Sequence, residues 1–362
     1  MRVLYDTQIF GMQKFGGISN YFANIISSLK KTEDVIVPHV TSDNEYIDQI
    51  SDRSTTFPIK YNFKGKNRFI SLLNKIYMVK ALKNEKYDVF HPTYYKNYHL
   101  KYLKKPFVIT VYDMIHELFP EYFHKNDFVI QNKQMLCNAA TRIIAISAQT
   151  KLDLIKIYNI PKEKIDVVYL ATDFKIYETK LHTLNLPSKY ILFVGNRQHY
   201  KNFNWMLEAI APVLKNQKIH LLCIGPKFNS DENYLIKKLY LDNLIIQTNV
   251  KASELPEVYN RAELFIFPSI YEGFGIPILE AFASKVPVLL ANASCFPEVA
   301  GDAAMYFEID NMHSLQQQVE ALLNDSTLRN IMIEKGLMQL SKYSWDKCAA
   351  DTLETYKKSC EI

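Results

Sequence analysis

Short apolar runs alternate with longer amphipathic stretches along almost the whole chain. The runs have the length and β-branched content of buried strands, and the stretches between them repeat their apolar positions with a helical period. In the first half this pattern predicts strands over Val3–Asp6, Val35–Val40, Val89–His91, Phe107–Val111, Arg142–Ile146 and Asp166–Val168. In the second half it predicts strands over Tyr190–Val194, His220–Ile224, Asn243–Gln247, Leu264–Phe267 and Val286–Leu290. Such alternation favours an α/β protein with parallel sheets covered by helices on both faces.

The alternation stops once, in a polar and irregular stretch, and this break predicts two domains. At 362 residues the chain is long for one hydrophobic core and suits two. We expect a first doubly wound domain over residues 1–173, a linker over 174–189, a second domain over 190–344 and a last helical segment over 345–362. Helices are predicted over Ile18–Lys30, Phe69–Leu82, Ile276–Ala283, Met312–Leu323, Thr327–Ser341 and Trp345–Lys357, the last capped by Ser344.

Composition narrows the class of protein. Apolar residues make up 48% and charged residues 22%, as in a soluble globular protein. No run of 18 apolar residues predicts a membrane-spanning helix, and the chain starts with a predicted strand rather than a signal peptide. The five cysteines have no paired spacing, which indicates reduced thiols in the cytoplasm and no zinc site.

Charge is distributed unevenly along the chain. Residues 1–173 hold 24 Lys and Arg against 17 Asp and Glu, whereas the remainder holds 19 against 21. The window 60–105 alone carries twelve basic side chains, two acids and several tyrosines and phenylalanines. Such a surface suits an anionic membrane face or a phosphate-bearing acceptor, and a merely solvated helix face is the alternative. Nucleic acid is not favoured as a partner because no binding motif accompanies the charge.

The stretch Tyr271–Ala281 carries the most specific chemistry. Two carboxylates, Glu272 and Glu280, enclose a turn that leads from a predicted strand into a predicted helix. The turn and the first helical position consist of Gly273, Phe274, Gly275 and Ile276. N–H groups at a helix start, together with the helix dipole, bind anions, and glycine lets the backbone approach a ligand closely. An ordinary strand–turn–helix with two surface glutamates is the alternative.

This pattern resembles the nucleotide-sugar site of the retaining glycosyltransferases of the glycosyl transferase group 1 family. The resemblance implies that Glu280 holds the ribose hydroxyls of the donor. It also implies that Glu272, placed among the catalytic residues, and the 273–276 backbone meet the donor sugar and diphosphate. The implied architecture is GT-B, in which two doubly wound, Rossmann-like domains face a cleft and the final helix often crosses back to the first domain.

A second motif, residues 194–202, follows the first strand after the predicted linker. The guanidinium of Arg197 carries several N–H donors in one plane, and the ammonium of Lys201 is a mobile point charge. Both groups are suited to binding phosphate. The motif resembles a loop of the same family whose arginine and lysine neutralise the donor diphosphate, although the position of the arginine differs among relatives. Two exposed basic side chains in a loop are the alternative. Because the chain contains no Asp-x-Asp pair, we expect metal-independent catalysis and no cofactor besides the nucleoside-diphosphate sugar substrate.

Candidate residues in the first domain are fewer. Gly16 and Gly17 take the position of the family's glycine-rich loop, where their backbone would approach the donor, and a simple turn is the alternative. His91, Asp113 and His116 follow predicted strands and are candidate catalytic residues, or else helix caps. Many family members have His-Asp where this chain has Tyr112-Asp113, so the histidine's role is either lost or moved to His116. Ser147 matches a family serine near the cleft or caps the next helix.

The resemblance implies a retaining glycosyltransferase that moves a hexose from a nucleoside-diphosphate sugar to a glycan hydroxyl. Bacterial relatives with a similar Tyr-Asp-Met-Ile-His-Glu stretch, here residues 112–117, build surface polysaccharides such as O-antigen, which suggests a mannosyltransferase-like enzyme of lipopolysaccharide biosynthesis. We expect a polyprenyl-diphosphate-linked acceptor and a cytoplasmic enzyme, peripheral at the inner membrane face. A nucleotide-sugar 2-epimerase of the same fold and a non-catalytic nucleotide-sugar-binding protein are the alternatives.

Overall fold

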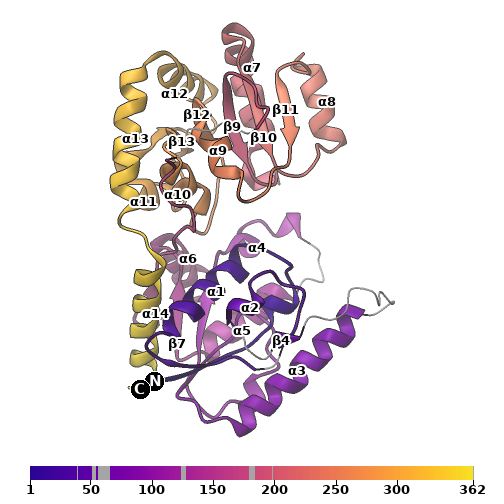
Figure 1. Ribbon diagram of the computed structural model, residues 1–362, viewed down its shortest axis with the longest axis vertical. Coiled ribbons are helices and arrows are strands. Elements are labelled where there is room, and N and C mark those ends of the chain that lie inside the picture. The colour runs from indigo at the N-terminus through magenta and orange to yellow at the C-terminus, as the bar shows by residue number, and fades with distance from the viewer. Residues whose placement is uncertain are drawn as a thin grey trace. The chain divides into compact units, whose positions relative to one another are not determined.

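The computed structural model describes residues 1–38, 40–50, 54–55, 66–123, 128–178, 184–197 and 199–361. The chain divides into two compact units. Unit 1 comprises Met1–Leu170 and Ser344–Ile362, and unit 2 comprises Ala171–Tyr343 (Figure 1). The described part of the stretch predicted as a linker, 174–189, is therefore counted with unit 2, and the C-terminal helix is counted with unit 1.

Unit 1 is built on parallel strands. Its main strands are β1 (Arg2–Tyr5), β2 (Asp34–Ile36), β5 (Val89–His91), β6 (Val108–Val111), β7 (Arg142–Ala145) and β8 (Ile165–Val167). They form two three-stranded sheets, β2-β1-β5 and β6-β7-β8, which a parallel bridge between Phe90 and Phe107 connects. A small separate pair joins β3 (Val40–Thr41) to β4 (Ser54–Thr55). The strand order reverses between β1 and β5, as in a doubly wound sheet.

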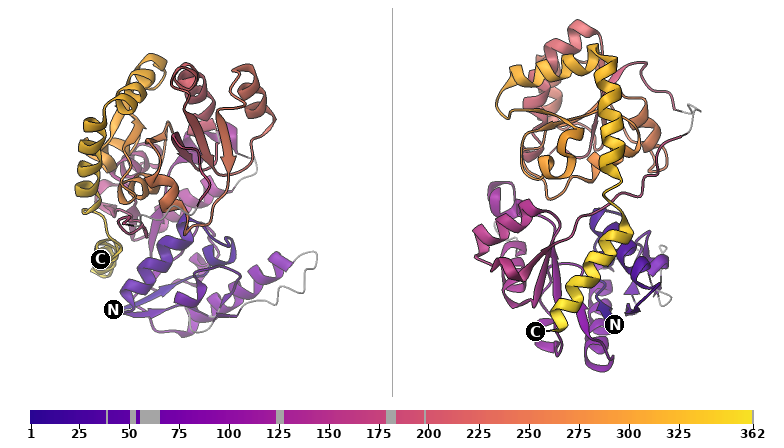
Figure 2. Two further views of the ribbon diagram at one scale, coloured as in Figure 1. Left: turned by 45° about the horizontal axis from the view of Figure 1, so that its top comes forward. Right: turned by 90° about the vertical axis from the view of Figure 1, so that its left-hand side faces the viewer.

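Helices surround these strands. Those of unit 1 are α1 (Gly17–Leu29), α2 (Ile47–Ile50), α3 (Lys66–Asn84), α4 (Ile115–Leu118), α5 (Val129–Ala139), α6 (Ala148–Tyr158) and α14 (Trp345–Cys360). Helix α14 lies along unit 1, and the two chain ends lie at the same end of that unit (Figures 1 and 2). Ser344 caps α14 by accepting a hydrogen bond from the Lys347 amide at 3.1 Å, as the sequence predicts. The phenol hydroxyls of Tyr356 and Tyr5 lie 2.6 Å apart and fasten α14 to β1.

Unit 2 contains one parallel sheet of six strands in the order β11-β10-β9-β12-β13-β14. The strands are β9 (Tyr190–Val194), β10 (His220–Ile224), β11 (Ile245–Thr248), β12 (Leu264–Phe267), β13 (Val288–Ala291) and β14 (Met305–Phe307). The helices are α7 (Phe203–Gln217), α8 (Ser230–Lys238), α9 (Leu255–Asn260), α10 (Ile276–Ala283), α11 (Phe296–Ala300), α12 (Met312–Asn324) and α13 (Ser326–Leu340). Both units are thus Rossmann-like, which confirms the predicted fold class.

Proline accounts for two differences between the predicted and observed strands. The strand predicted over Val35–Val40 is wrong: β2 ends at Ile36, and Val40 belongs to β3. Pro38 lies between them and has no N–H group to donate to a ladder. Strand β13 likewise begins at Val288, directly after Pro287, rather than at the predicted Val286. Strand β14 was not predicted from the sequence.

Among the described residues, no helix is both long enough and apolar enough to cross a membrane.

Candidate functional site

The sheet of unit 2 reverses its strand order between β9 and β12. In open α/β sheets, ligands bind outside the carboxyl ends of the strands at such a reversal. The two motifs singled out in the sequence follow these two strands: Lys201 comes after β9, and Glu272 comes after β12. The fold therefore brings together two segments that lie far apart in sequence.

Lys201 and Glu272 form an ion pair at this place. The Lys201 ammonium lies 2.5 Å from Glu272 Oε1, and both side chains are largely buried. The Ile270 amide donates to the Tyr200 carbonyl at 2.9 Å, which fixes the two loops to each other. The Glu272 carbonyl accepts from the Ser294 hydroxyl at 2.8 Å, so the glutamate's backbone is also held. The result is a positioned cation and carboxylate side by side.

Helix α10 begins directly after this pair. Gly275 has a positive φ of 92°, and a Cβ atom there would lie 3.0 Å from Ile278 Cδ1, so the turn requires glycine. The Phe274 ring is buried and meets the Tyr343 ring edge-on at 5.7 Å. Phe274 thus anchors the turn that leads into α10. The helix N-terminus adds a favourable dipole for an anion.

Glu280 lies further along α10. Its carboxylate accepts a hydrogen bond from the Tyr259 hydroxyl at 3.0 Å. Burial, and to a smaller extent the nearby negative charge of Asp173, raises the pKa of Glu280 to about 7, although the Tyr259 hydrogen bond opposes this shift. Ligand hydroxyls that donate hydrogen bonds to this buried carboxylate would stabilise its ionised form.

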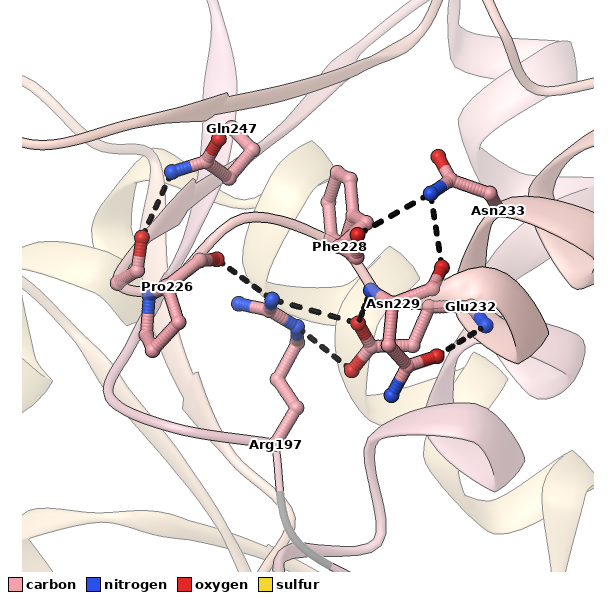
Figure 3. Close-up of polar contacts among 8 residues, drawn as sticks. Arg197, Pro226, Phe228, Asn229, Glu232, Asn233 and Gln247 are labelled. Carbon is pink, nitrogen blue, oxygen red and sulfur yellow. Dashed lines mark hydrogen bonds and ion pairs between the residues drawn. The ribbon is translucent and has the colours of Figure 1, made fainter.

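Arg197 has a different environment from the one expected for a phosphate ligand. Its side chain is 3% exposed and forms an ion pair with Glu232, whose oxygens lie 2.8 Å from Nε and 3.3 Å from Nη2 (Figure 3). Nη2 also donates to the Pro226 carbonyl at 2.6 Å. The guanidinium carbon lies 4.6 Å from the centre of the Phe228 ring. Nε and Nη2 are thus engaged within the protein, whereas the buried Nη1 has no hydrogen-bond partner among the described residues, and the assignment of Arg197 to the donor diphosphate stays a prediction.

Arg197 holds the loop that joins β10 to α8. Arg197 binds the Pro226 carbonyl, and the Gln247 side-chain amide donates to the preceding carbonyl, that of Gly225, at 2.6 Å (Figure 3). Glu232 was not predicted from the sequence as the partner of Arg197. A signal for it was present, since Asn229 and Glu232 have the spacing of a capping box, and the structure forms that box at the start of α8.

The glycines of unit 1 lie at the start of α1. Gly16 precedes the helix and Gly17 is its first residue. A Cβ atom on Gly16 would come within 2.6 Å of the flexible end of the Gln13 side chain, which would have to shift to make room for it. No described atom lies within 4 Å of the corresponding position on Gly17, so this end of the helix has space around it.

His91 is part of the core of unit 1. Its side chain is 0% exposed. Nδ1 lies 2.6 Å from the Tyr356 hydroxyl, and Nε2 lies 3.0 Å from the Thr110 hydroxyl. Burial lowers the pKa of His91 to about 3, which keeps the ring neutral. Its contacts are those of a residue that fastens α14 to the sheet, and we do not carry it into the proposed site.

Asp113 precedes the short helix α4, and His116 is the second residue of that helix. Asp113 Oδ1 accepts from the Ile115 amide at 3.0 Å, but the N-cap of α4 is Met114, without a side-chain cap, and the catalytic assignment of Asp113 stays a prediction. The His116 ring stacks on Phe123 with centroids 3.9 Å apart. Ser147 accepts from the Thr150 amide at 3.0 Å and so caps α6, the second of the two interpretations.

A buried ion pair that the sequence did not reveal joins α4 to α5. The Lys133 ammonium is 2.8 Å from Glu117 Oε2, and the two side chains are 1% and 3% exposed. Lys133 also donates to the Asp113 carbonyl at 2.9 Å, and the Tyr158 hydroxyl donates to Glu117. This cluster fixes the segment that carries Asp113 and His116.

Comparison with known families accounts for most of the chain. Residues 178–338 match the family described as glycosyl transferases group 1, and residues 15–175 match the glycosyltransferase family 4 description. The two matches meet close to the boundary between units 1 and 2.

Curated relatives are similar over long stretches. The chain is 26% identical to O-antigen chain mannosyltransferase B of Escherichia coli, over 99% of this chain and 100% of that protein. It is 28% identical, over 63% of this chain and 62% of the relative, to a Campylobacter jejuni enzyme. That enzyme is named N-acetylgalactosamine-N,N'-diacetylbacillosaminyl-diphospho-undecaprenol 4-alpha-N-acetylgalactosaminyltransferase.

Solved structures share the fold. Anabaena HepE in complex with UDP and glucose superposes with a TM-score of 0.76 at 16% identity, over 98% of this chain and 99% of that chain. WaaG, a glycosyltransferase involved in lipopolysaccharide biosynthesis, gives 0.67 at 15% identity, over 98% and 99% of the two chains. These likenesses show the GT-B architecture.

Proposed function

Because the chain belongs to the glycosyl transferase group 1 family, we propose that this glycosyltransferase transfers a hexose, with retention of configuration, from a nucleoside-diphosphate sugar to a lipid-linked glycan. The names of the relatives support bacterial surface-polysaccharide or O-antigen biosynthesis as the setting, and mannose as the first sugar to test. The printed name of the Campylobacter relative supports a diphosphate-linked polyprenyl acceptor.

The observation that carries the proposal is the meeting of Lys201 with Glu272, 2.5 Å apart, next to the start of α10. In our account, Lys201 and the N–H groups of Gly273–Ile276 hold the donor diphosphate. Glu272 lies beside that diphosphate and faces the hexose. Glu280, on the same helix, accepts hydrogen bonds from the ribose hydroxyls.

The proposed chemistry is a displacement on one face of the sugar. The bond between the anomeric carbon and the diphosphate oxygen breaks as the acceptor oxygen approaches from the same side, and a new glycosidic bond forms there. The acceptor proton passes to the leaving diphosphate oxygen. Lys201 and the helix N-terminus stabilise the negative charge that develops on that diphosphate. Glu272 is not assigned as a nucleophile, because its carboxylate is paired with Lys201.

We propose that the reaction is independent of metal ions, since the Lys201 ammonium and the N–H groups at the start of α10 supply the charge that a divalent ion would otherwise provide. Initial rates of sugar transfer should then be the same with and without EDTA. Loss of activity in EDTA and recovery on adding manganese would contradict this part of the proposal.

We also propose that the enzyme works at an anionic membrane face. Lys101, Lys104 and Lys105 are exposed, and Leu72 and Ile76 on α3 are each 55% exposed. Leu72 and Ile76 are one turn apart and so share a helix face. Each lysine near an anionic surface contributes about 1 kcal/mol of attraction. Residues 60–65 of the basic window, with Tyr61 and Phe63, lie outside the described residues.

The identity of the donor is tested by thermal shift. The protein is heated with UDP, GDP, ADP and their hexose conjugates, because a ligand that binds only the folded state raises the melting temperature. We expect one nucleoside diphosphate to raise it most. No shift with any of these ligands would overturn the proposal that unit 2 binds a nucleotide sugar.

The two alternatives give different products with the best donor. A 2-epimerase would change the sugar in the absence of any acceptor, and a binding protein would change nothing. We expect neither outcome: an acceptor is required, and the free or nucleotide-linked sugar is not epimerised. The positioned Lys201–Glu272 pair favours an active enzyme over a binding protein.

A further inference from the structure

Two adjoining cavities lie in unit 1, at the carboxyl ends of β1 and β5, where the strand order reverses. The larger has a volume of about 450 Å³, within the range of small-ligand sites. The cavities share Gly11, Ser71 and Lys96. A reversal of strand order is also where open α/β sheets bind ligands. This position is therefore equivalent in unit 1 to that of the donor site in unit 2.

The walls of these cavities are fixed to each other. The Ser42 hydroxyl donates to the Phe10 carbonyl, and the Asn44 side-chain amide donates to the Gln13 carbonyl at 2.7 Å. A Cβ atom on Gly11 would lie 3.3 Å from Asn74 Nδ2, so a glycine lets this loop come close to α3. The shape of the pocket is thus set before any ligand arrives.

Lys96 is held in place at both ends. Its amide donates to Gln8 Oε1 at 2.8 Å, and its ammonium donates to the Ser71 hydroxyl at 3.1 Å. Gln8 is fixed in turn, because its amide and its side chain both donate to the buried Asp6 carboxylate. The Thr93 amide and hydroxyl donate to the same carboxylate at 2.7 and 2.6 Å. This network leaves the Lys96 ammonium positioned at the boundary of the two cavities with hydrogen-bonding capacity to spare.

Positive charge predominates around the pocket. Lys14 lines the larger cavity and Lys75 the smaller, and the Lys75 ammonium lies 5.6 Å from the centre of the Tyr98 ring. Among the described residues that line either cavity, three are lysines and Asp43 is the one acid. The pocket therefore presents a net charge of about +2 together with the hydroxyls of Thr41 and Ser42.

We propose that this pocket binds the diphosphate of the glycan acceptor, with Lys96 as the central ligand and Lys14 and Lys75 on either side. The proposal rests on the proposed function, since it names the chemistry of that acceptor. Ammonium groups act as point charges for phosphate oxygens, and several of them suit a doubly charged group better than a neutral sugar. The donor diphosphate is assigned to unit 2, so the two diphosphates have separate sites within the chain.

The acceptor, the donor and a membrane phospholipid all carry a phosphate group that this pocket could bind. Inorganic pyrophosphate is therefore used as the probe. Its affinity is measured by isothermal titration calorimetry on the full chain, once alone and once with the nucleoside diphosphate that gives the largest thermal shift. The variants are Lys96→Gln and Lys14→Gln. The matched control is Lys80→Gln, since Lys80 is exposed on α3 and lines neither cavity. Melting temperatures without ligand report on folding.

We expect pyrophosphate to bind the natural chain with nucleotide present, and Lys96→Gln to weaken this binding at least about tenfold, as loss of a charged hydrogen bond does. Lys14→Gln should weaken it less, and Lys80→Gln should not change it. Equal affinity in Lys96→Gln and the natural chain would overturn the proposal, as would complete displacement of pyrophosphate by nucleotide. Because this arm needs no sugar transfer, its outcome is separate from that of the proposed function.

Two further arms identify the source of the phosphate. With a polyprenyl-diphosphate glycan, Lys96→Gln should raise the acceptor KM at least about tenfold and leave the donor KM unchanged. Binding to phosphatidylglycerol vesicles should be the same in Lys96→Gln and Lys80→Gln. A selective loss of vesicle binding in Lys96→Gln, with the acceptor KM unchanged, would show a phospholipid site and overturn the assignment to the acceptor.

Discussion

Lys201 and Glu272 are 71 residues apart in sequence, yet the ammonium of the first lies 2.5 Å from the carboxylate of the second. Each follows one of the two strands, β9 and β12, between which the sheet of unit 2 reverses its order. The pair gives the proposed donor site a cation whose position is fixed and a carboxylate whose charge is balanced.

Replacing Lys201 with Gln should lower kcat about 100-fold, because a group that stabilises charge on the leaving diphosphate contributes roughly this much. Affinity for the nucleoside diphosphate should fall, while affinity for the corresponding nucleoside, which has no phosphate, should stay the same. Lys227→Gln is the control, since Lys227 is exposed in the neighbouring loop after β10. An equal loss of nucleoside affinity would show that Lys201 supports the fold rather than the diphosphate.

Replacing Arg197 with Met should destabilise the protein, because Glu232 would remain buried without its partner. The loss in unfolding free energy should be about 3–5 kcal/mol, measured by urea denaturation. The double variant Arg197→Met/Glu232→Met should recover most of this loss, since it leaves no unpaired buried charge. If Arg197→Met instead keeps full stability but loses nucleotide affinity, Arg197 is a donor ligand after all.

The stability of the protein should depend on pH through Glu280. Its folded pKa of about 7 lies above the ordinary value of 4.5, so the folded state keeps this proton when the unfolded state has lost it. Stability therefore falls as pH rises from about 4.5 to 7, by up to about 3 kcal/mol. Glu280→Gln does not titrate, so its stability relative to the natural chain should increase over this range. A difference that stays constant from pH 5 to pH 8 would contradict the raised pKa.

Nucleotide binding should show the opposite dependence at the same residue. Ribose hydroxyls donate to the ionised carboxylate, so binding favours loss of the Glu280 proton and affinity should increase from pH 6 to pH 8. In Glu280→Gln, calorimetry should show weaker binding by about 1.5–3 kcal/mol at pH 8 and no such increase. Unchanged nucleotide affinity in this variant would remove the assignment of Glu280 to the ribose.

Association with membranes should depend on the exposed lysines of unit 1. The natural chain should sediment with anionic vesicles at low salt and be released as salt rises, since salt screens charges beyond about 8 Å at physiological strength. Changing Lys101, Lys104 and Lys105 to Glu should reduce vesicle binding and activity on a lipid-linked acceptor, with donor affinity unchanged. Absence of binding at low salt would leave these lysines as an ordinary solvated surface.

The sequence predicted the backbone of the donor site better than its side-chain partners. Strand β12 and helix α10 have the bounds expected from the sequence, because buried parallel strands are continuous apolar runs and because the glycines mark the turn between them. Lys201 and Glu272 were singled out separately, and their contact follows from the strand order, which local periodicity does not encode.

Residues whose partners are distant in sequence have surroundings that local patterns did not predict. Arg197 has the composition of a phosphate ligand, but Glu232, 35 residues away, neutralises it. His91 ends a strand as a catalytic histidine would, but Tyr356, 265 residues away, covers it. In both cases the surroundings of the polar side chain depend on a partner from an element that comes later in the sequence.

The most direct test of the central claim is the anomeric configuration of the transferred sugar. The protein is incubated with the best nucleoside-diphosphate hexose and a glycan acceptor, and the product is analysed by NMR through the coupling constant of the new anomeric proton. Our account predicts a product with the same anomeric configuration as the donor, formed by the natural chain and about 100-fold more slowly by Lys201→Gln. A product of inverted configuration, or a donor sugar that changes without transfer, would contradict it.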